Sequence, residues 1–459
     1  MPKPRRGDVV ELVVDDLAFG GDGVGRLDGY VVFVRGGLPG DRLRVRVTEA
    51  RARYARAVVE QVEEPSPQRV EAPCPYFGRC GGCRFQHLAY EAQLALKAKQ
   101  VRDCLERLGG LAGVALRPIL PAPETYGYRN KMEFTITGTA GAPVVGLHEA
   151  DRYDVVLDIE RCLLQSEAMN RLLTAVREEL RAGELSVWDP ATESGLMRFV
   201  TLREGRRTGD LMVNLVASAP AVETLAPVAA RLRAREPALA AVVLNVNAKK
   251  AAVAVGTEEH VLAGRDHIRE ALGGLEFRVS ANSFFQTNTG QAERLFGLVV
   301  EACELTGAET VVDLYSGTGA ISLLLARRCR RVYGIEVAPA AVEDAVRNAR
   351  ANGIDNCTFL VGEVRHVLPR LIAEGVRAEV VVADPPRAGF HPKALGALAT
   401  LAPARVVYVS CNPATLARDL SGLVRAGYRL EWVQPVDMFP QTPHIEAVAR
   451  LTRERAPGA

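Results

Sequence analysis

Three stretches of the chain differ in how apolar and polar positions follow one another. In the first stretch, up to about residue 62, apolar and polar side chains alternate in short runs between glycine turns. The strand-like runs are 9–14, 30–34, 41–47 and 56–62. Alternation with a period of two is typical of strands that bury one face. About five such strands with glycine turns predict a small β-barrel of the OB type over residues 1–64.

The second stretch, residues 65–270, mixes helical and strand patterns. A helical pattern covers about 90–108. Strand-like runs follow at 130–136, 155–159, 197–202, 211–217 and 241–245. This mixture predicts a central α/β domain, and the helix near 90–108 is a candidate to pack on the domain that follows.

In the third stretch, residues 271–459, strand-like and helical runs alternate regularly. The seven strand-like runs are 310–314, 331–335, 357–361, 378–383, 405–409, 430–435 and 445–451. Regular alternation predicts a seven-stranded, largely parallel sheet with helices on both faces, which is a Rossmann-like α/β domain.

The composition is that of an ordinary globular protein of several domains, with 459 residues, 48% hydrophobic and 24% charged. No apolar run approaches the roughly 18–20 residues of a membrane span. The basic N-terminus lacks the apolar segment of a signal peptide. Nine cysteines without a secretory signal predict a reducing, cytoplasmic location.

The net charge is only +2, so binding to a polyanion would depend on local patches. Between Arg35 and Arg56, seven arginines stand against Asp41 and Glu49, a local excess of five positive charges. A solvated surface is the plain interpretation of such a run. On a small barrel, the same excess favours binding to nucleic acid.

A candidate nucleophile comes directly after one of the predicted strands. Cys411 follows the apolar run 404–409 and precedes an Asn-Pro break, which would hold it at a sheet edge. Asp384 ends another strand 27 residues earlier, and Glu446 lies 35 residues later. A thiol and two carboxylates at one sheet edge suggest covalent catalysis with base assistance, whereas an isolated cysteine is usually a small buried hydrophobe.

A cofactor loop is predicted where the first strand of this domain meets its helix. Residues 311–319 give a strand, a tight glycine turn and a helix start, and Glu336 ends the next strand, where it can accept hydrogen bonds from ribose hydroxyls. A dinucleotide fingerprint would place Gly or Ala at Ser322, and Asp313 would face phosphates unfavourably. The cationic amino and sulfonium groups of S-adenosylmethionine suit acidic loop residues, so we favour this methyl donor.

The spacing Cys74-x5-Cys80-x2-Cys83, with glycines between, can wrap around a metal centre, and Cys162 is the candidate fourth ligand. Zinc and a [4Fe–4S] cluster both accept four thiolates, so the residues alone leave both open. Four further cysteines lie within helix or strand patterns and are expected to pack in the core: Cys104, Cys303, Cys329 and Cys357.

Taken together, these residues resemble the RNA uracil-5-methyltransferase family, and more closely its large-subunit ribosomal RNA branch. The resemblance covers nearly the whole chain. It is carried by the motifs at 283–288, 313–315, 384–387, 410–413 and 444–446. One visible departure is Ala320, where some members carry Asn.

The resemblance implies a TRAM domain that binds RNA, a central domain with a [4Fe–4S] cluster rather than zinc, and a catalytic domain that binds S-adenosylmethionine. It implies these roles for the residues: Gln286, Tyr315, Glu336 and Asp384 contact the methyl donor, Cys411 is the nucleophile, Glu446 is the base, and Cys74, Cys80, Cys83 and Cys162 hold the cluster. The expected product is 5-methyluridine, in 23S ribosomal RNA by preference and in transfer RNA as the alternative. The protein is expected to be a monomer.

Because uracil C6 is inaccessible in a stacked helix, the target base is expected to flip out. Phe284 is a candidate to stack beside it, and packing in the core is its alternative. Arg129 and Lys131, two apart in a strand pattern, suit phosphate contacts, unless they are simply a solvated pair.

Two rival functions belong to other classes. Asp-Pro-Pro followed by an aromatic residue marks amino-group methyltransferases, although Arg387 follows here and that chemistry needs no cysteine. A non-catalytic metal-binding RNA module is the second rival, and it predicts binding without turnover.

Overall fold

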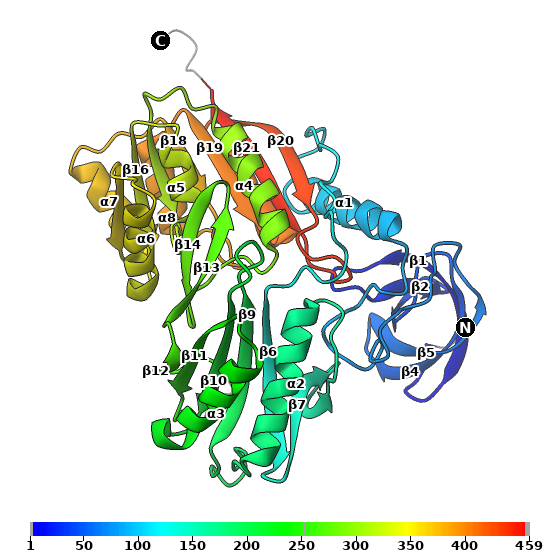
Figure 1. The fold of residues 1–459 in the computed structure, drawn as a ribbon. Helices are drawn as coiled ribbons and strands as arrows, with labels where there is room; N and C mark the ends of the chain where they lie inside the picture. Colours follow the sequence, from blue (N-terminus) through cyan, green and yellow to red (C-terminus); the bar gives the residue numbers. More distant parts are fainter. Residues whose placement is uncertain (1–2, 251–252, 455–459) are drawn as a thin grey trace.

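The computed structural model describes residues 3–250 and 253–454, which form a barrel, a central α/β part and a C-terminal α/β part (Figure 1). The barrel lies to one side, the central sheet below and the C-terminal sheet above in this view. None of the described helices combines the length and the apolarity that crossing a membrane requires.

The first strands close into a five-stranded barrel in the order β1-β2-β3-β5-β4. Its strands are β1 (Val9–Leu17), β2 (Gly23–Leu27), β3 (Tyr30–Arg35), β4 (Arg42–Ala50) and β5 (Tyr54–Glu64). Along β4, arginines point outward while Leu43, Val45 and Val47 are buried, as the alternation predicts. The predicted barrel is confirmed. The strand pattern missed β2, because its two glycines and one arginine leave little apolar alternation.

The central sheet has seven strands in the order β12-β11-β10-β9-β6-β7-β8. Its strands are β6 (Lys131–Thr139), β7 (Ala142–Glu149), β8 (Arg152–Asp158), β9 (Met197–Glu204), β10 (Leu211–Ala217), β11 (Leu239–Val246) and β12 (Glu258–Gly264), and helices α2 (Glu167–Ala182) and α3 (Val222–Arg235) cover it. Five of these strands match predicted runs. The pattern missed β7, which glycine and proline interrupt, and β12, an edge strand with little buried surface.

The C-terminal sheet has the order β17-β16-β15-β18-β19-β21-β20. Its strands are β15 (Thr310–Leu314), β16 (Arg331–Glu336), β17 (Cys357–Val361), β18 (Val380–Ala383), β19 (Arg405–Ser410), β20 (Tyr428–Val436) and β21 (Glu446–Arg453). Strands β15 to β19 are parallel, and β21 runs antiparallel to both of its neighbours. The predicted seven-stranded Rossmann-like domain is confirmed.

Helices cover both faces of this sheet, and side chains of one strand alternate between two cores. Val311 of β15 belongs to one core, while Val312 and Leu314 belong to the other. The helices are α4 (Thr289–Cys303), α5 (Ala320–Ala326), α6 (Pro339–Ala351), α7 (Val364–Ala373), α8 (Pro392–Leu401) and α9 (Pro413–Arg425). Strands buried on both faces explain the continuous apolar runs in the sequence.

Helix α1 (Tyr90–Arg107) packs on the C-terminal part, against α9 and β20 (Figure 1). Its Val101 and Leu105 belong to the same core as the residues of α9. The hairpin of β13 (His267–Leu272) and β14 (Leu275–Ser280) also contributes to a core of the C-terminal sheet. The predicted boundary between residues 270 and 271 stays a prediction, and it falls inside β13.

Candidate active site and cofactor cavity

The parallel strands of the C-terminal sheet end in register at one edge. Leu314 lies beside Ile335 on one side and Ala383 on the other. The residues that follow these positions are Tyr315, Glu336 and Asp384. Because carboxyl ends of parallel strands share one edge, three of the predicted cofactor residues meet there.

The same edge brings together the predicted nucleophile and base. Strand β21 runs opposite to β19, and Ser410 pairs with Ala447. Extending this register by one residue sets Cys411 opposite Glu446. The sheet thus unites two residues that are 35 positions apart in the sequence.

Burial and neighbouring carboxylates shape the protonation of this pair. Burial, then Glu446, then Asp384 raise the pKa of the Cys411 thiol to about 11, and Arg387 opposes them. Glu446 is only 5% exposed. Burial and Asp384 raise its pKa well above the usual range for a carboxyl group, against Arg387. Without RNA, the thiol is therefore protonated at neutral pH.

A cavity opens beside this edge, lined by the glycine loop, the loop before α4 and Asp384. Its lining residues are Phe284, Phe285, Gln286, Phe296, Asp313, Tyr315, Ser316, Gly317, Thr318, Ala320, Ile321 and Asp384. Three of the four predicted cofactor residues line it directly: Gln286, Tyr315 and Asp384. Burial raises the pKa of Asp384 to about 6.

The fourth predicted cofactor residue, Glu336, shapes the glycine loop. Its carboxylate accepts hydrogen bonds from the backbone N–H of Gly317 at 3.0 Å and of Ala338 at 2.9 Å. Tyr315 has φ 69°, an uncommon conformation for a residue with a side chain. The chain therefore turns sharply at the end of β15, which exposes the backbone of the loop to the cavity.

Asp313 is a lining residue that the sequence analysis noted without assigning a role. It is fully buried, and Ser322 Oγ donates to its Oδ2 at 2.5 Å. Its Oδ1 has no hydrogen-bond partner among the described residues. Burial raises the pKa of Asp313 to about 7, with contributions from Asp384 and Glu336. Its signals in the sequence were its place in the motif 313–315 and its negative charge, which suits a cationic methyl donor.

The loop between β14 and α4 carries Gln286 and Phe284 to the cavity. The side chain of Asn130 donates to the carbonyl of Gln286 at 2.9 Å, and Arg203 donates to the carbonyl of Ser283 at 2.5 Å. Phe284 is 67% exposed, so the alternative of core packing is wrong. It also does not start a strand, because β14 has already ended at Ser280.

The predicted phosphate contacts Arg129 and Lys131 are not a strand pair, because β6 begins at Lys131. Burial lowers the pKa of Lys131, and Arg203 and Arg129 lower it further, whereas Glu133 opposes them. This group of cations lies close to the loop that carries Phe284, which suits an anionic ligand.

Comparisons with known proteins agree with this geometry. Residues 89–454 match the family model described as tRNA (uracil-5-)-methyltransferase, and residues 3–59 match the TRAM domain. An RNA methyltransferase of Halalkalibacterium halodurans, described as uncharacterized, is 42% identical over 447 residues, 97% of both chains. One from Gloeobacter violaceus, described likewise, is 43% identical over 450 residues, 98% of this chain and 97% of that one.

A solved structure is similar over nearly the whole chain. It is the tRNA (uracil-54, C5)-methyltransferase of Pyrococcus abyssi in complex with S-adenosyl-L-homocysteine. It is 31% identical with a TM-score of 0.76, covering 96% of this chain and 100% of that one.

The chain belongs to the RNA uracil-5-methyltransferase family.

As a member of this family, the protein is a methyltransferase that depends on S-adenosylmethionine and acts on RNA. The resemblance seen in the sequence is thereby confirmed at the level of the family. The residues that line the cavity fit this donor, because Asp313 and Asp384 offer carboxylates to its cationic groups.

The four cysteines that the sequence grouped line a second pocket in this uracil-5-methyltransferase. Cys74, Cys80, Cys83 and Cys162 share it with apolar side chains, including Met132, Leu147 and Ile159. No cysteine of the chain is in a disulfide. Burial is the largest cause that raises the pKa of Cys83 to about 12; Gln86 opposes it, and the nearby Cys162, Cys80 and Cys74 add to it.

Over residues 3–250 and 253–454, no three His, Cys, Asp or Glu side chains converge as the ligands of a single metal ion. The four thiols line one pocket, and four thiolates are a ligand set that zinc and a [4Fe–4S] cluster both accept. The other four cysteines, Cys104, Cys303, Cys329 and Cys357, lie within or against the two cores of the C-terminal part, as expected.

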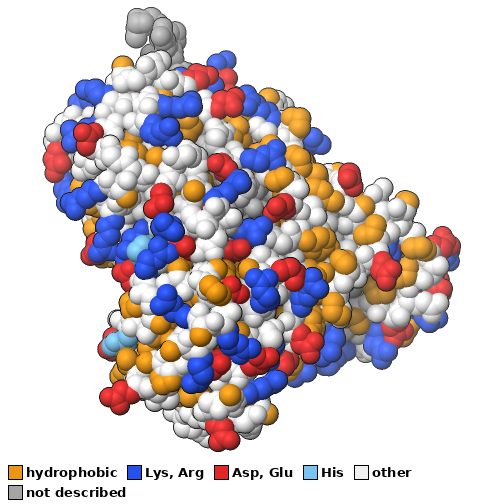
Figure 2. Space-filling model, viewed as in Figure 1, with side chains coloured by type: hydrophobic (Ala, Val, Ile, Leu, Met, Phe, Trp, Pro, Cys, Tyr) orange, Lys and Arg blue, Asp and Glu red, His pale blue; other side chains and the backbone are white. Residues whose placement is uncertain are grey.

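The basic excess predicted for the barrel is largely neutralised. Arg42, Arg44 and Arg46 of β4 form ion pairs with glutamates of β5, namely Glu64, Glu63 and Glu60. The window counted in the sequence ended before these glutamates. Figure 2 accordingly shows basic and acidic side chains interspersed over the visible face of the enzyme.

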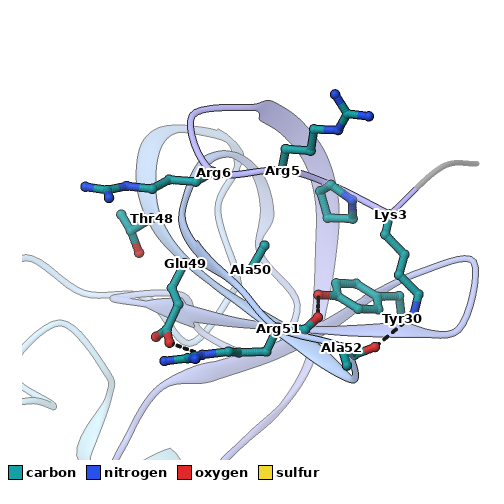
Figure 3. Close-up of a pocket in the computed structure, with 10 residues that line it drawn as sticks. Lys3, Arg5, Arg6, Tyr30, Thr48, Glu49, Ala50, Arg51 and Ala52 are labelled. Carbon is teal, nitrogen blue, oxygen red and sulfur yellow. Dashed lines mark hydrogen bonds and ion pairs between the residues drawn. The ribbon is translucent and has the colours of Figure 1, made fainter.

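A more open basic site lies at the start of the barrel. A hollow is lined by Lys3, Arg5, Arg6, Tyr30 and Arg51, among others (Figure 3). Lys3 Nζ donates to the carbonyl of Ala52 at 2.8 Å, whereas Arg5 and Arg6 extend away from the barrel. From the sequence, these first residues were considered only to exclude a signal peptide.

Proposed function

We propose that the enzyme forms 5-methyluridine, with Cys411 as the nucleophile and Glu446 as the base. The observation that carries this proposal is the register of β19 and β21, which sets Cys411 opposite Glu446 beside the cofactor cavity. Gln286, Tyr315, Glu336 and Asp384 are proposed to hold the methyl donor, three at the cavity wall and Glu336 through the glycine loop.

The reaction needs both partners because C5 of uracil is a poor nucleophile. The Cys411 thiolate adds to C6, and the electron pair of the C5–C6 double bond moves into the ring carbonyl as an enolate. Bound S-adenosylmethionine would supply the methyl group to C5, and S-adenosylhomocysteine would leave with the electron pair of the broken carbon–sulfur bond. The Glu446 carboxylate removes the C5 proton, the double bond re-forms, and the thiolate leaves.

Burial raises the pKa values of Cys411 and Glu446, so we propose that the bound substrate favours the ionised form of each group when it reacts. The thiol must lose a proton before it can add, and Glu446 must be ionised when it takes the C5 proton. Arg387 lowers the pKa of both groups and is the cation that favours ionisation here. The target uridine is proposed to flip out of its helix to reach this buried edge. The exposed ring of Phe284, which lines the neighbouring cavity, is the candidate to stack beside it.

Two RNA classes remain as substrates. We propose large-subunit ribosomal RNA first, from the resemblance of the motifs, barrel and cysteine spacing to that branch. Transfer RNA is the second candidate, because the Pyrococcus abyssi enzyme that resembles 96% of this chain is named for uracil 54 of tRNA. The barrel does not discriminate between the two, since that similarity includes it.

We also propose that the pocket of Cys74, Cys80, Cys83 and Cys162 holds a [4Fe–4S] cluster. Four half-buried thiols from two segments line one pocket and support it, and all four sulfurs would be used in ligation. The cluster would then shape the fold around it and take no part in methyl transfer. Anaerobically purified protein is expected to contain four irons and four acid-labile sulfides, and zinc in their place would reject the cluster.

One experiment tests the chemistry and the substrate together. Anaerobically purified protein, labelled S-adenosylmethionine and separate 23S rRNA and tRNA transcripts are combined, and the methylated nucleoside is mapped by mass. Label in 5-methyluridine of one RNA, lost in Cys411→Ala, is the expected result. Methyl on an exocyclic amine, or turnover unchanged by Cys411→Ala, would reject the mechanism in favour of an amino-group methyltransferase. Binding of RNA without turnover would favour a non-catalytic module.

A further inference from the structure

The segment 437–445, which we call the strap, leads directly into Glu446. It joins β20 to β21, whose last and first residues, Val436 and Glu446, pair with each other. Antiparallel strands can be joined by about two residues, yet the strap has nine. The pairing of β21 in the sheet sets the position of the backbone from Glu446 onward. The position of the backbone just before Glu446 depends on the strap.

Four consecutive carbonyls of the strap each accept a hydrogen bond from a distant part of the chain. The donors are Asn288 Nδ2 to Met438 at 3.0 Å, Lys97 Nζ to Phe439 at 3.1 Å, Tyr128 Oη to Pro440 at 2.9 Å, and the backbone N–H groups of Arg84 and Phe85 to Gln441, both at 3.0 Å. A loop on a surface would satisfy these carbonyls with water. Here, four segments from outside the strap set its path.

The pair of Gln93 and Gln441 lies at the centre of this arrangement. Gln93 Nε2 donates to Gln441 Oε1 at 3.0 Å, and the backbone N–H of Gln441 donates back to Gln93 Oε1 at 3.1 Å. The same Gln93 amide also donates to the carbonyls of Phe85 and Leu88. Gln441 has φ 68°, a conformation that costs free energy for a residue with a side chain.

A buried ion pair fixes the first residue of the strap. Lys97 and Asp437 are both fully buried, and Lys97 Nζ lies 2.6 Å from Asp437 Oδ1. Burying two charges is unfavourable unless their geometry is well satisfied. Neither residue lines the cofactor cavity, so contact with the methyl donor does not explain them.

We call the edge of the C-terminal sheet that carries Cys411 and Glu446 the catalytic edge. The strap also connects this catalytic edge to the cysteine pocket. Arg84 and Phe85, which bind the carbonyl of Gln441, directly follow Cys83. Gln86, next in the chain, accepts a hydrogen bond from the backbone N–H of Cys74 at 3.3 Å. The segment that carries three of the four cysteines is therefore one of the anchors of the strap.

We infer that Gln93 is a positioning residue for the base, holding the strap through Gln441 so that Glu446 can reach C5. This inference rests on the proposed roles of Cys411 and Glu446. It predicts a specific defect in the last step of the reaction, because proton removal from C5 needs Glu446 in place, whereas addition of the thiolate and methyl transfer do not.

The test measures how fast the methylated enzyme–RNA adduct decays. Full-length protein, the substrate RNA and methyl-labelled S-adenosylmethionine are mixed, chased with unlabelled reagents, and sampled on denaturing gels. Two variants disturb the strap: Gln93→Leu removes the whole amide, and Gln441→Asn shortens the side chain while tolerating the positive φ. Lys99→Ala is the matched control, because Lys99 lies on α1 but pairs with Asp16 and Asp103 instead of the strap.

We expect adduct decay to slow about 10- to 100-fold in Gln93→Leu and less in Gln441→Asn, with KM for S-adenosylmethionine unchanged. Lys99→Ala should decay like the wild type. A purely structural role of Gln93 would lower the amount of adduct formed but leave its decay rate unchanged, which would overturn the inference. Because Gln441→Asn retains the backbone hydrogen bonds, it keeps the test decisive if Gln93→Leu does not fold.

Glu446→Gln distinguishes a failure of the positioning role of Gln93 from a failure of the proposed mechanism. If its adduct persists while both strap variants decay at the wild-type rate, the positioning role is wrong and the proposed mechanism stands. If wild-type enzyme methylates RNA and Glu446→Gln neither traps an adduct nor slows turnover, the proposed mechanism fails, and the positioning role with it.

Discussion

The barrel and the catalytic edge of the C-terminal sheet hold charged groups in opposite ways. On the barrel, Arg46 is 59% exposed and pairs with Glu60, so opposite charges meet in water. At the catalytic edge, Glu446 and Asp313 are buried and Asp384 is half-buried beside them, and the pKa of each is raised. An exposed ion pair contributes little to the free energy of folding. A buried carboxylate lowers the stability of the fold unless a cation or hydrogen-bond donors compensate for its lost hydration.

This contrast indicates a different role for the charged groups of each region. The barrel offers charges that an RNA backbone can exchange for phosphate contacts at small cost. The catalytic edge holds groups whose protonation is far from that in water, which is typical of catalytic sites. Four experiments test the contrast, in order of decreasing effect.

The largest effect is expected from Cys411→Ala at the catalytic edge. Turnover should fall by at least about 10⁴-fold, because no other group can add to C6. Thermal unfolding should stay close to that of the wild type, since a half-buried thiol contributes little packing. Methyl transfer and adduct formation on denaturing gels provide the measurement. Turnover within tenfold of the wild type would contradict the difference drawn between the two regions.

Lys97→Met tests whether a buried ion pair contributes more to stability than an exposed pair on the barrel. It leaves Asp437 buried without its cation, so the free energy of unfolding should fall by about 3–5 kcal/mol. Urea denaturation measures this loss. The matched barrel variant Arg46→Ala should lose less than about 1 kcal/mol, because its ion pair is exposed. Adding Asp437→Leu to Lys97→Met should restore much of the stability, and equal losses from Lys97→Met and Arg46→Ala would remove the contrast.

The pH dependence of Cys411 alkylation tests whether neighbouring charges at the catalytic edge shift the pKa of this thiol. With its pKa raised to about 11, the thiol should react slowly with iodoacetamide at pH 8, and the rate should rise as the pH approaches 11. Glu446→Gln removes a negative neighbour, so the pKa should fall and alkylation at pH 8 should accelerate severalfold. Arg387→Ala should act in the opposite direction. Mass analysis of the peptide with Cys411 gives the rate, and equal rates in all three proteins would show that these charges do not act on the thiol.

The smallest effect is expected at the basic hollow of the barrel. Replacing both Arg5 and Arg6 with glutamine should weaken RNA binding only severalfold at physiological salt. The slope of log K against log salt should become shallower by about 1.4–1.8, because two phosphate contacts are lost. Arg46→Ala should change the slope less, because the guanidinium of Arg46 is already paired with Glu60. If Arg46→Ala has the larger effect, the RNA follows β4 and not the start of the barrel.

Much of the fold followed from local pattern. The central strands β15, β18 and β19 of the C-terminal sheet are buried on both faces, so each appears as a short apolar run between helices. Strands with weak patterns were missed, namely β2, β7 and β12, because glycines, a proline or an exposed edge hide their alternation. The hairpin of β13 and β14 was not predicted either. The barrel's net charge was misjudged for a different reason. The partners of its arginines lie on β5, outside the counted window, and only pairing of the strands brings them together.

The sequence by itself determined the kind of chemistry, because Cys411, Glu446, Asp384 and the glycine loop are chemically distinctive and each follows or begins a recognisable strand. Only the tertiary structure decided how these residues meet, since the antiparallel return of β21 sets Glu446 opposite Cys411. The strap shows the same limit more sharply. Gln93 and Gln441 are 348 positions apart, and a glutamine in a helix pattern carries no sign of a distant partner. Local periodicity reports which face of an element is buried, whereas the identity of a contact depends on how whole elements pack.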